Sequence, residues 1–262
     1  MARLFLSVII PAYNEAERLP RTLLDIDRYL SSPEFAKLVR RYGSGFTPSA
    51  YEILVVSDGS KDKTAEVAKK FAAMIRNLLV VDNSENHGKG YVVRQGMLEA
   101  HGKYRLFTDA DNSTSIDHIE RLLPEFQKGY DVVVCSRAVK GSTIAVHQPF
   151  YKELLGKLGN LFIQVAAVWG VWDTQCGFKA VTEKAAKDIF PKMIIDRWGF
   201  DVEMLALARA LGYKIKEVPV NWVNDPKTHV KFSSYFQVLG ETVKVRFNLW
   251  RNRYGIRKRK RK

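Results

Sequence analysis

Five short apolar segments in the first half of the chain constrain its fold most strongly. They lie at residues 4–10, 51–57, 78–81, 104–108 and 131–136. Helical patterns lie between them and end near residues 30, 76, 100 and 128. Short apolar strands that alternate with helices are typical of a mainly parallel sheet covered on both faces. The sequence therefore predicts an α/β fold, in which residues 31–50, with Pro33 and Pro48, form an inserted excursion.

Polar residues follow four of the predicted strands, at residues 11–15, 58–60, 109–113 and 136–137. Ligands of open α/β sheets bind beyond the carboxyl ends of the strands. Asp109 and Asp111 project on the same side of an extended backbone, so one divalent cation can bridge them. Their hard oxygens suit Mg²⁺ or Mn²⁺ that carries a substrate diphosphate. We therefore expect a metal and nucleotide site at this edge of the sheet.

Two other classes of nucleotide-binding protein do not fit the sequence. A dinucleotide oxidoreductase needs a glycine-rich turn after its first strand, where this chain has Pro-Ala-Tyr-Asn-Glu. Gly88-x-Gly90 lacks the third glycine of that pattern, and no glycine-rich loop ends in Lys-Ser or Lys-Thr. The interpretation that remains is a nucleotide held by Asp58 and the first loop, with its diphosphate on a metal ion.

Four motifs of the first half resemble the family 2 glycosyltransferases of GT-A fold. They are Val-Ile-Ile-Pro-Ala-Tyr-Asn-Glu at residues 8–15, Asp-Gly-Ser-x-Asp-x-Thr at 58–64, Asn-x-Gly-Lys-Gly at 86–90 and Asp-Ala-Asp at 109–111. In the second half, residues 173–179, 197–203 and 218–222 look like the eukaryotic dolichyl-phosphate β-glucosyltransferases. The resemblance covers roughly residues 4–254. It implies a GT-A (nucleotide-diphospho-sugar transferase) fold, a mainly parallel sheet flanked by helices.

The resemblance also implies an activity. A metal-dependent, inverting enzyme of this kind transfers a hexose from a nucleotide-diphospho-sugar donor to a polyprenyl or dolichyl phosphate acceptor. Glucose from UDP-glucose is the expected sugar, and Mg²⁺ or Mn²⁺ is the expected cofactor. Dolichyl-phosphate mannose synthase is a related enzyme, so a GDP-mannose-dependent mannosyltransferase is one alternative. A family 2 transferase that acts on a saccharide hydroxyl is the other.

The strand ends and the resemblance together assign roles to individual residues. The nucleotide sugar is assigned to Pro11, Ala12, Tyr13, Asn14, Glu15, Asp58, Gly59, Ser60, Gly88, Lys89, Asp109 and Ala110. The metal ion is assigned to Asp109 and Asp111, and catalysis to Asp111, Arg137, Asp201 and Glu203. The acceptor phosphate is assigned to Arg137, Lys152, Gln175 and Lys231. A lipid monophosphate, whose second pKa is about 6, is largely ionised at neutral pH and needs no strong general base.

Some of these assignments have alternatives. Asp201 and Glu203 follow a turn into a predicted helix, where an acidic side chain can instead cap the helix. Ser113 stands where the mannose synthases carry a possible third metal ligand, which leaves that contact to water. Lys152 replaces an arginine of the glucosyltransferases, and the differing loop at residues 224–230 weakens the assignment of Lys231. A nucleophilic Cys176 is disfavoured, because an inverting displacement forms no covalent intermediate.

The C-terminal part predicts a membrane contact. Apolar residues recur at three- and four-residue spacings at 232, 235, 236, 239, 243, 247, 250 and 254. They form one face of a helix that leads into residues 251–262, which hold eight of the Lys and Arg residues of a chain with net charge +14. An aromatic helix next to a basic tail suits an anionic membrane surface. The alternatives are a face that packs on the catalytic domain and a tail that is simply solvated. The apolar helix around residues 154–169 raises the same question.

Three domains are expected: a GT-A catalytic domain at residues 1–230, an amphipathic helix at 231–254 and a basic tail at 255–262. No signal peptide is visible, and the longest apolar stretch, residues 158–172, is too short to span a bilayer. Two cysteines in apolar surroundings fit a reducing compartment. We therefore expect a cytoplasmic enzyme at the cytoplasmic face of a membrane. A nucleic-acid-binding protein is disfavoured, because the basic and aromatic residues form no recognisable module of that kind.

Overall fold

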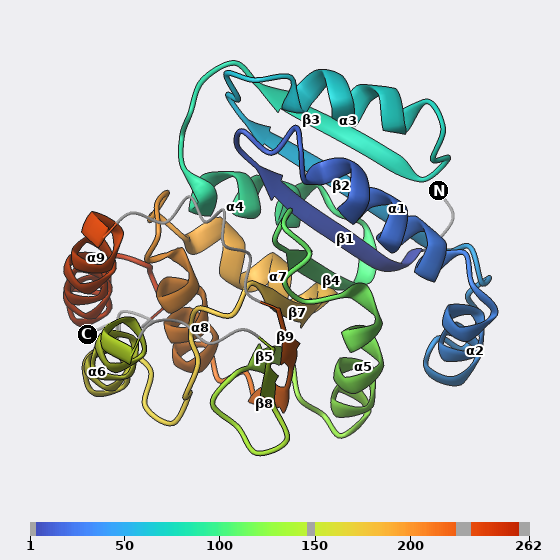
Figure 1. Ribbon diagram of the computed structural model, residues 1–262. Coiled ribbons are helices and arrows are strands. Elements are labelled where there is room, and N and C mark those ends of the chain that lie inside the picture. The colour runs from blue at the N-terminus through green and yellow to red at the C-terminus, as the bar shows by residue number, and fades with distance from the viewer. Residues whose placement is uncertain (1–3, 146–149, 224–231, 257–262) are drawn as a thin grey trace.

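The computed structural model describes residues 4–145, 150–223 and 232–256. A seven-stranded sheet with the order β3-β2-β1-β4-β7-β5-β8 runs through it (Figure 1). Its strands are β1 (Leu4–Ala12), β2 (Tyr51–Asp58), β3 (Leu78–Asn83), β4 (Gly102–Thr108), β5 (Val132–Ser136), β7 (Phe178–Thr182) and β8 (Ile215–Pro219). Only β7 within this sheet is antiparallel to its neighbours, β4 and β5. This mixed, mainly parallel sheet confirms the predicted fold class.

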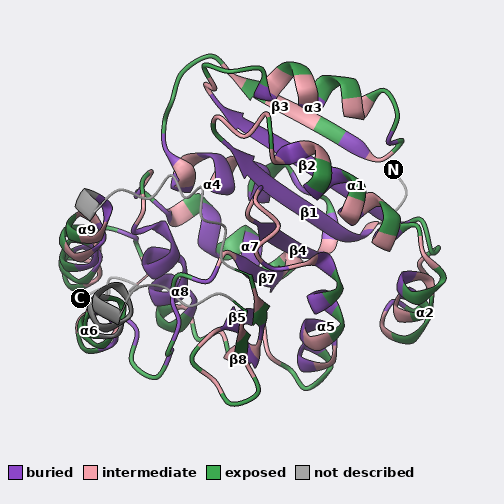
Figure 2. Ribbon diagram, viewed as in Figure 1, coloured by how far each residue is buried: buried purple, intermediate pink, exposed green. Residues whose placement is uncertain are grey.

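Helices cover both faces of the sheet, and each face has its own hydrophobic core. One core is formed with α1 (Leu19–Leu30), α2 (Pro33–Tyr42), α3 (Thr64–Ala72) and α5 (Ile119–Gln127). The other is formed with α4 (Lys89–Glu99), α6 (Phe150–Ala166), α7 (Glu183–Ile189), α8 (Phe200–Ala210) and α9 (Phe232–Trp250). Successive residues of a strand point to opposite faces, so Val8 and Ile10 enter the first core and Ile9 the second. Figure 2 shows β1 and β2 buried between the two layers, whereas the edge strand β3 is partly exposed.

Short elements complete the chain. They are the 3-10 turns η1 (Ile116–His118) and η2 (Phe190–Lys192) and a parallel pair formed by β6 (Thr143–Ile144) and β9 (Asn221–Trp222). This pair brings the segment after β5 next to the segment after β8.

The predicted excursion at residues 31–50 contains a helix, α2. Proline is accepted in the first turn of a helix, where its missing N–H has no intrahelical partner. Ser32 caps that turn, because its Oγ accepts the backbone N–H of Phe35 at 3.2 Å. Phe35 and Val39 are fully buried, and the ring of Phe35 lies 6.3 Å from that of Phe5. Pro33, which in the sequence suggested irregular structure, therefore starts a helix that closes one core.

The carboxyl ends of β1, β2, β4 and β5 lie at one edge of the sheet, which we call the carboxyl edge. Ala12 pairs with Ser57 across β1 and β2, and Thr108 pairs with Phe178 across β4 and β7. Because β7 is antiparallel, it begins at the edge where its neighbours end. The loop at residues 173–177 therefore reaches the same edge as Asp109 and Asp111.

The C-terminal helix divides its apolar residues between two environments. Val238 and Val245 are buried in the second core, whereas Phe236, Val243, Phe247 and Trp250 are exposed. Both expectations for this helix, packing on the catalytic domain and an exposed aromatic face, therefore apply to different residues. Lys231 and residues 257–262 of the basic tail lie outside the described residues. Within the described ranges, no helix has the length and hydropathy needed to span a membrane.

Candidate active site

A cavity of about 390 Å³ lies at the carboxyl edge of the sheet. It brings together ten of the predicted residues: Pro11, Ala12, Tyr13, Glu15, Asp58, Gly88, Lys89, Asp109, Ala110 and Asp111. Six further residues complete its lining: Arg18, Asn86, Val92, Arg197, Trp198 and Ser234. Three residues assigned to the nucleotide sugar, Asn14, Gly59 and Ser60, are not among the lining residues. The cavity thus combines an acidic centre with cationic and aromatic walls.

Two loops at the carboxyl edge are joined by hydrogen bonds. The backbone N–H of Asn14 donates to Ser60 Oγ at 3.2 Å, and its side-chain carbonyl accepts the N–H of Lys61 at 2.8 Å. Asn14 adopts a left-handed backbone conformation, with φ of 56°, which asparagine tolerates better than most residues. Glu15 donates its N–H to Thr64 Oγ1 at 2.7 Å. The predicted residues Asn14 and Ser60 therefore connect the two loops and are not among the residues that line the cavity.

Asp58 organises the loop that carries the Asn-x-Gly-Lys-Gly motif. Its carboxylate accepts the backbone N–H of His87 at 2.7 Å, that of Gly88 at 2.9 Å and the side-chain amide of Asn86 at 2.9 Å. Burial raises the pKa of Asp58, although these backbone donors and Arg197 act in the opposite direction. The carboxylate thereby fixes one wall of the cavity.

Position 88 requires glycine, because the segment at residues 196–197 approaches it closely. Its φ is 109°, and a Cβ at this position would lie 2.4 Å from the backbone oxygen of Asp196. The same segment supplies Arg197, whose guanidinium donates to Asn86 Oδ1 at 2.9 Å. Loops that are more than 100 residues apart in the chain therefore meet at this wall of the cavity.

Asp109 and Asp111 form the acidic centre. Lys89 Nζ lies 2.6 Å from Asp109 Oδ1. The backbone N–H of Ser113 donates to Asp111 Oδ1 at 2.9 Å, and Thr22 Oγ1 donates to the carbonyl of Ala110 at 2.6 Å. Burial, followed by repulsion from Asp109, raises the pKa of Asp111. Burial alone would lower the pKa of Lys89, but Asp109 and Asp201 outweigh it and raise that pKa.

The acidic pair fits a divalent cation that shares its coordination with a ligand. The two aspartates bear hard oxygen donors, and mutual repulsion disfavours their joint ionisation unless a cation is near. No group of three or more metal-binding side chains occurs in the part of the chain that the structure describes. A cation held by two carboxylates needs further oxygens, which a diphosphate and water can supply. The donor set therefore matches Mg²⁺ or Mn²⁺ bound together with a diphosphate.

Gly177 packs directly against Asp109. A Cβ at Gly177 would lie only 1.9 Å from Asp109 Oδ2 and 2.4 Å from its Cγ. This position therefore accommodates the carboxylate only because it has no side chain. Gly177 lies just before β7, so the antiparallel strand brings it to the acidic centre.

Asp201 forms a buried ion pair next to the acidic centre. Lys179 Nζ lies 2.6 Å from Asp201 Oδ1, and it also donates to the carbonyl of Cys176. Lys179 is fully buried and Asp201 is 5% exposed. Burial raises the pKa of Asp201, although Lys179 and Lys89 lower it. The Asp201 carboxylate pairs with the lysine of β7, so capping of α8 does not account for its position.

Glu203 has an environment that differs from the predicted one. It is fully buried, and its carboxylate accepts the backbone N–H of Ile194 at 3.1 Å, that of Ile195 at 2.9 Å and the hydroxyl of Tyr254 at 2.8 Å. It is not among the residues that line the described cavity. This environment favours a structural role that holds residues 194–195 and the segment after α9, in place of the predicted catalytic role.

Arg137 is fixed by Asp173. Its Nε and Nη2 donate to the two carboxylate oxygens at 2.7 and 2.9 Å, and its backbone N–H donates at 2.9 Å. Burial alone would lower the pKa of Arg137, but Asp173 outweighs it and keeps the group charged. Glu217 holds Asp173 in turn, because its Oε1 accepts the backbone N–H of Asp173 at 2.9 Å. The guanidinium lies over the ring of Trp222, 5.2 Å from its centroid.

The other predicted acceptor residues are less defined. Gln175 is exposed on the loop before β7, and its N–H contacts Asp173 Oδ1 at 3.3 Å. Lys152 belongs to α6, but its side chain lies outside the described residues, as does all of Lys231. Their roles toward an acceptor phosphate stay predictions.

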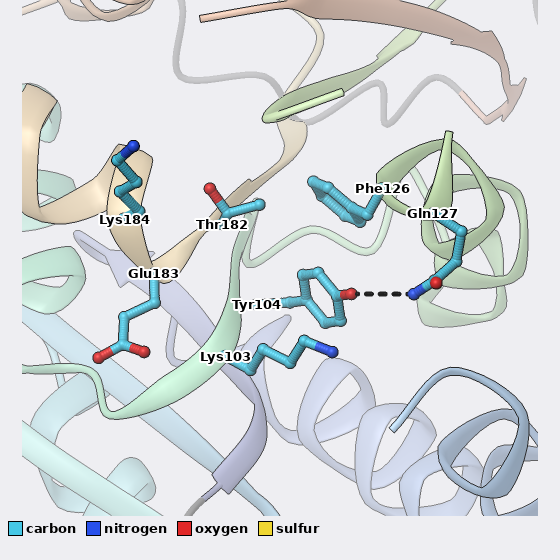
Figure 3. Close-up of a pocket in the computed structure, with 7 residues that line it drawn as sticks. All are labelled: Lys103, Tyr104, Phe126, Gln127, Thr182, Glu183 and Lys184. Carbon is cyan, nitrogen blue, oxygen red and sulfur yellow. Dashed lines mark hydrogen bonds between the residues drawn. The ribbon is translucent and has the colours of Figure 1, made fainter. Parts of the chain in front are cut away.

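A second cavity, of about 380 Å³, lies at the opposite edge of the sheet. It is lined by Lys103, Tyr104, Phe126, Gln127, Thr182, Glu183 and Lys184 (Figure 3). The Tyr104 hydroxyl accepts a hydrogen bond from Gln127 at 3.4 Å. This cavity contains one carboxylate and none of the predicted site residues, so the cavity at the carboxyl edge is the candidate active site.

Several residues in and around the site belong to the sequence motifs at 86–90, 173–179 and 197–203, but the sequence assigns them no role. They are Asn86, Asp173, Gly177, Lys179, Arg197 and Trp198. Their place in these motifs was the only sequence feature that indicated a function. It does not reveal which of them face the cavity. Arg18 and Ser234 had no such signal, because tertiary packing alone brings α1 and α9 to the cavity.

The chain is similar in sequence to a known family and to individual proteins. A sequence model described as glycosyl transferase family 2 matches residues 7–190. A dolichyl-phosphate beta-glucosyltransferase of Dictyostelium discoideum is 37% identical over 252 residues, which cover 93% of this chain and 74% of that protein. A protein of the same description from Drosophila melanogaster is 37% identical over 245 residues, covering 89% and 72%.

A solved structure shares the fold. Glucosyl-3-phosphoglycerate synthase from Mycobacterium tuberculosis, in complex with Mn²⁺, UDP-glucose and phosphoglyceric acid, superposes with a TM-score of 0.63 at 14% identity. The match covers 98% of this chain and 81% of that one. At this identity the likeness shows the fold alone.

Proposed function

Because the chain belongs to glycosyltransferase family 2, we propose that it transfers glucose from UDP-glucose to dolichyl phosphate. One observation carries the proposal. Relatives that match about nine-tenths of the chain are described as dolichyl-phosphate beta-glucosyltransferases. The cavity supports it, since Asp109 and Asp111 meet cationic and aromatic side chains there. The proposed products are a lipid phosphate glucose, inverted at its anomeric carbon, and UDP.

The protein's own residues supply most of the proposed mechanism. A divalent cation on Asp109 and Asp111 would offset the negative charge that develops on the leaving diphosphate. Lys89 and Arg197 line the same cavity and would add positive charge near that diphosphate. Asp58 holds the loop at 86–88, which forms the wall beside the nucleotide. These groups position the donor before the reaction, so little reorganisation is needed.

The acceptor needs positioning more than activation. A lipid monophosphate is already nucleophilic near neutral pH, because its second pKa is about 6. Arg137 is the proposed contact, since Asp173 orients its guanidinium. Asp109 is close enough to interact electrostatically with Arg137, so this cation lies near the acidic centre. Among the described histidines, His118 is buried, and its Nε2 accepts the N–H of Asn221 at 2.9 Å. This environment does not suit His118 to act as a general base.

Donor turnover tests the proposal. The protein should release UDP from UDP-glucose in the presence of Mg²⁺ or Mn²⁺ only when a polyprenyl phosphate is added. The release should fall in Asp111→Ala, because one of the two carboxylates at the acidic centre is lost. Nucleotide release can be measured with UDP-glucose and GDP-mannose in parallel.

Each other outcome of that assay is informative. Release of GDP instead of UDP would reassign the enzyme to mannosyl transfer. Turnover with a saccharide acceptor but not with the lipid would overturn the acceptor. No release with either donor would contradict the proposed function altogether.

We also propose that the enzyme binds the cytoplasmic face of a membrane through two neighbouring helices. The exposed helix surface consists of Leu158, Leu161, Phe162, Val165, Trp169, Trp172, Phe236, Val243, Phe247 and Trp250. The first six recur at three- and four-residue spacings along α6 and the turn after it. Helices α6 and α9 are in contact and lie at one end of the molecule (Figure 1). Trp169 and Trp250 are 67% and 68% exposed, and large exposed apolar patches mark interaction sites.

Charge favours an anionic lipid surface as the partner. Lys244, Arg246 and Arg251 are exposed on or just after α9, and eight Lys and Arg residues lie between 251 and 262. Aromatic side chains next to Lys and Arg suit the interface between lipid headgroups and acyl chains. A polyprenyl phosphate also lies in a membrane, so this surface would bring the cavity to its acceptor.

Liposome binding tests the membrane proposal. Replacing Trp169 and Trp250 together with serine should weaken binding to anionic liposomes by about tenfold, because burial of apolar side chains is lost. Removing residues 257–262 should also weaken binding, and more strongly at low salt, because its contribution is electrostatic. UDP release in detergent, with a polyprenyl phosphate added, should be retained in both variants. Unchanged cosedimentation of the tryptophan variant would refute the assignment of this surface.

A further inference from the structure

The ammonium group of Lys89 is bound to the carboxylate of Asp109, which is one of the two proposed ligands of the metal ion. Lys89 Nζ is 2.6 Å from Asp109 Oδ1, a charge-assisted hydrogen bond. Asp111 and Asp201 also lie close enough to attract this ammonium. An internal cation therefore lies against the acidic centre and offsets part of its negative charge.

The backbone on both sides of Lys89 is fixed. A Cβ on Gly88 would lie 2.4 Å from the oxygen of Asp196, and one on Gly90 would lie 2.6 Å from that of Ile195. The lysine therefore starts from a rigid point, while its four-carbon stem can rotate. Movement of the ammonium by a few ångströms needs no change in the backbone.

Asp109 has less freedom than Lys89. Gly177 lies against its carboxylate, and the carbonyl of Ala110 is held by Thr22. When another cation approaches Asp109 Oδ1, the group that can yield is the ammonium. A nearby diphosphate would offer that ammonium a new anionic partner.

We infer that Lys89 is an internal counter-ion that occupies Asp109 in the free enzyme and transfers to the donor diphosphate, so that divalent cation and donor bind together. The inference rests on the proposed function, because it requires a diphosphate donor at this cavity. A free cation must displace the ammonium without giving it a new partner, whereas a cation that arrives with a diphosphate supplies one. Lys89 is thus a positioning residue that couples the two binding events.

Binding of Mn²⁺ tests this coupling without turnover. Free Mn²⁺ is measured by electron paramagnetic resonance on the intact protein, with no nucleotide and then with UDP. Lys89→Met should bind Mn²⁺ alone at least about tenfold more tightly and bind UDP in the presence of Mn²⁺ about tenfold more weakly, the size expected for one charge-assisted hydrogen bond. Lys89→Arg should resemble the unaltered protein in both measurements.

The control is Lys69→Met. Lys69 also pairs with an aspartate, Asp82, at 2.7 Å, but it is 60% exposed and is not among the residues that line the cavity. In this variant neither the affinity for Mn²⁺ alone nor the affinity for UDP with Mn²⁺ should change. That result would exclude an effect of net charge alone.

The two affinities should move in opposite directions, and a merely structural lysine would not produce this pattern. Weaker binding of both Mn²⁺ and UDP in Lys89→Met, or no change in either, would overturn the inference. Failure of the proposed function gives a different result: the unaltered protein would release no UDP in the presence of polyprenyl phosphate, whatever its affinity for free Mn²⁺.

Discussion

Replacing Gly177 with alanine should lower donor turnover by about 100-fold, the loss expected for a displacement of about 1 Å at a reacting centre. The added methyl group would occupy the place of the Asp109 carboxylate, since the Cβ position lies 1.9 Å from Oδ2. The carboxylate is the end of a side chain and can rotate away. The fold should therefore survive while the acidic centre is distorted.

The measurement compares lipid-dependent nucleotide release with thermal unfolding. Gly177→Ala should unfold within a few degrees of the unaltered protein, because the steric conflict is with a side chain and φ at this glycine is not positive. The matched control is Gly240→Ala, where the added Cβ meets no atom within 4 Å among the described residues, apart from its chain neighbours and the backbone of its own helix. It should keep its turnover. Full activity of Gly177→Ala would show that the position of Asp109 does not matter to the reaction.

The sequence predicted the fold well where local patterns decide the structure. The five apolar segments became β1 to β5, because their periodicity and flanking loops were sufficient. Residues 33–42 were missed as a helix, since Pro33 stops a helix in its interior but starts one in its first turn. The antiparallel strand β7 was also not foreseen, because its pairing with β4 and β5 joins residues that are far apart in the chain.

The candidate site was predictable in its centre and less so at its margins. Asp58 ends β2, and Asp109 and Asp111 come just after β4, so the rule for carboxyl ends places them. Lys89 opens α4 after the loop that follows β3. Which partner each side chain has depends on tertiary packing. The sequence suggested that Glu203 acts in catalysis, yet it accepts three hydrogen bonds from residues 194, 195 and 254. Likewise, the pairing of Arg137 with Asp173 spans 36 residues and has no local signal.

Loss of the buried ion pair between Lys179 and Asp201 should have the largest effect on stability. Lys179→Met removes the ammonium 2.6 Å from Asp201 Oδ1 and leaves a carboxylate without its counter-ion in the interior. Breaking a buried pair on one side costs about 3–5 kcal/mol. In a chain of this size, the midpoint of thermal unfolding should fall by about 10 °C.

The loss of stability in Lys179→Met should be smaller at low pH than at neutral pH. Burial already raises the pKa of Asp201, and Lys179 counteracts that effect. Without Lys179 the pKa in the folded state rises further above its unfolded value, so the folded state binds more protons than the unfolded state. The free energy of unfolding of the variant should therefore increase as pH falls toward this raised pKa. The destabilisation should grow as pH rises above the pKa of this carboxyl in the unfolded state, because folding then requires either a buried charge or the uptake of a proton.

Urea unfolding at several pH values measures this prediction. Lys187→Met is the matched control, because Lys187 pairs with Glu183 at 2.6 Å but is 64% exposed, and exposed pairs contribute little. Asp201→Asn introduced into Lys179→Met should recover part of the lost stability at neutral pH, because it removes the unpaired charge and keeps the shape. Equal destabilisation by Lys179→Met at all pH values would show that lost packing, rather than the buried charge, is the cause. Recovery in the double variant would separate the structural role of this pair from any part that Asp201 has in transfer, since such a protein should fold well and still turn over slowly.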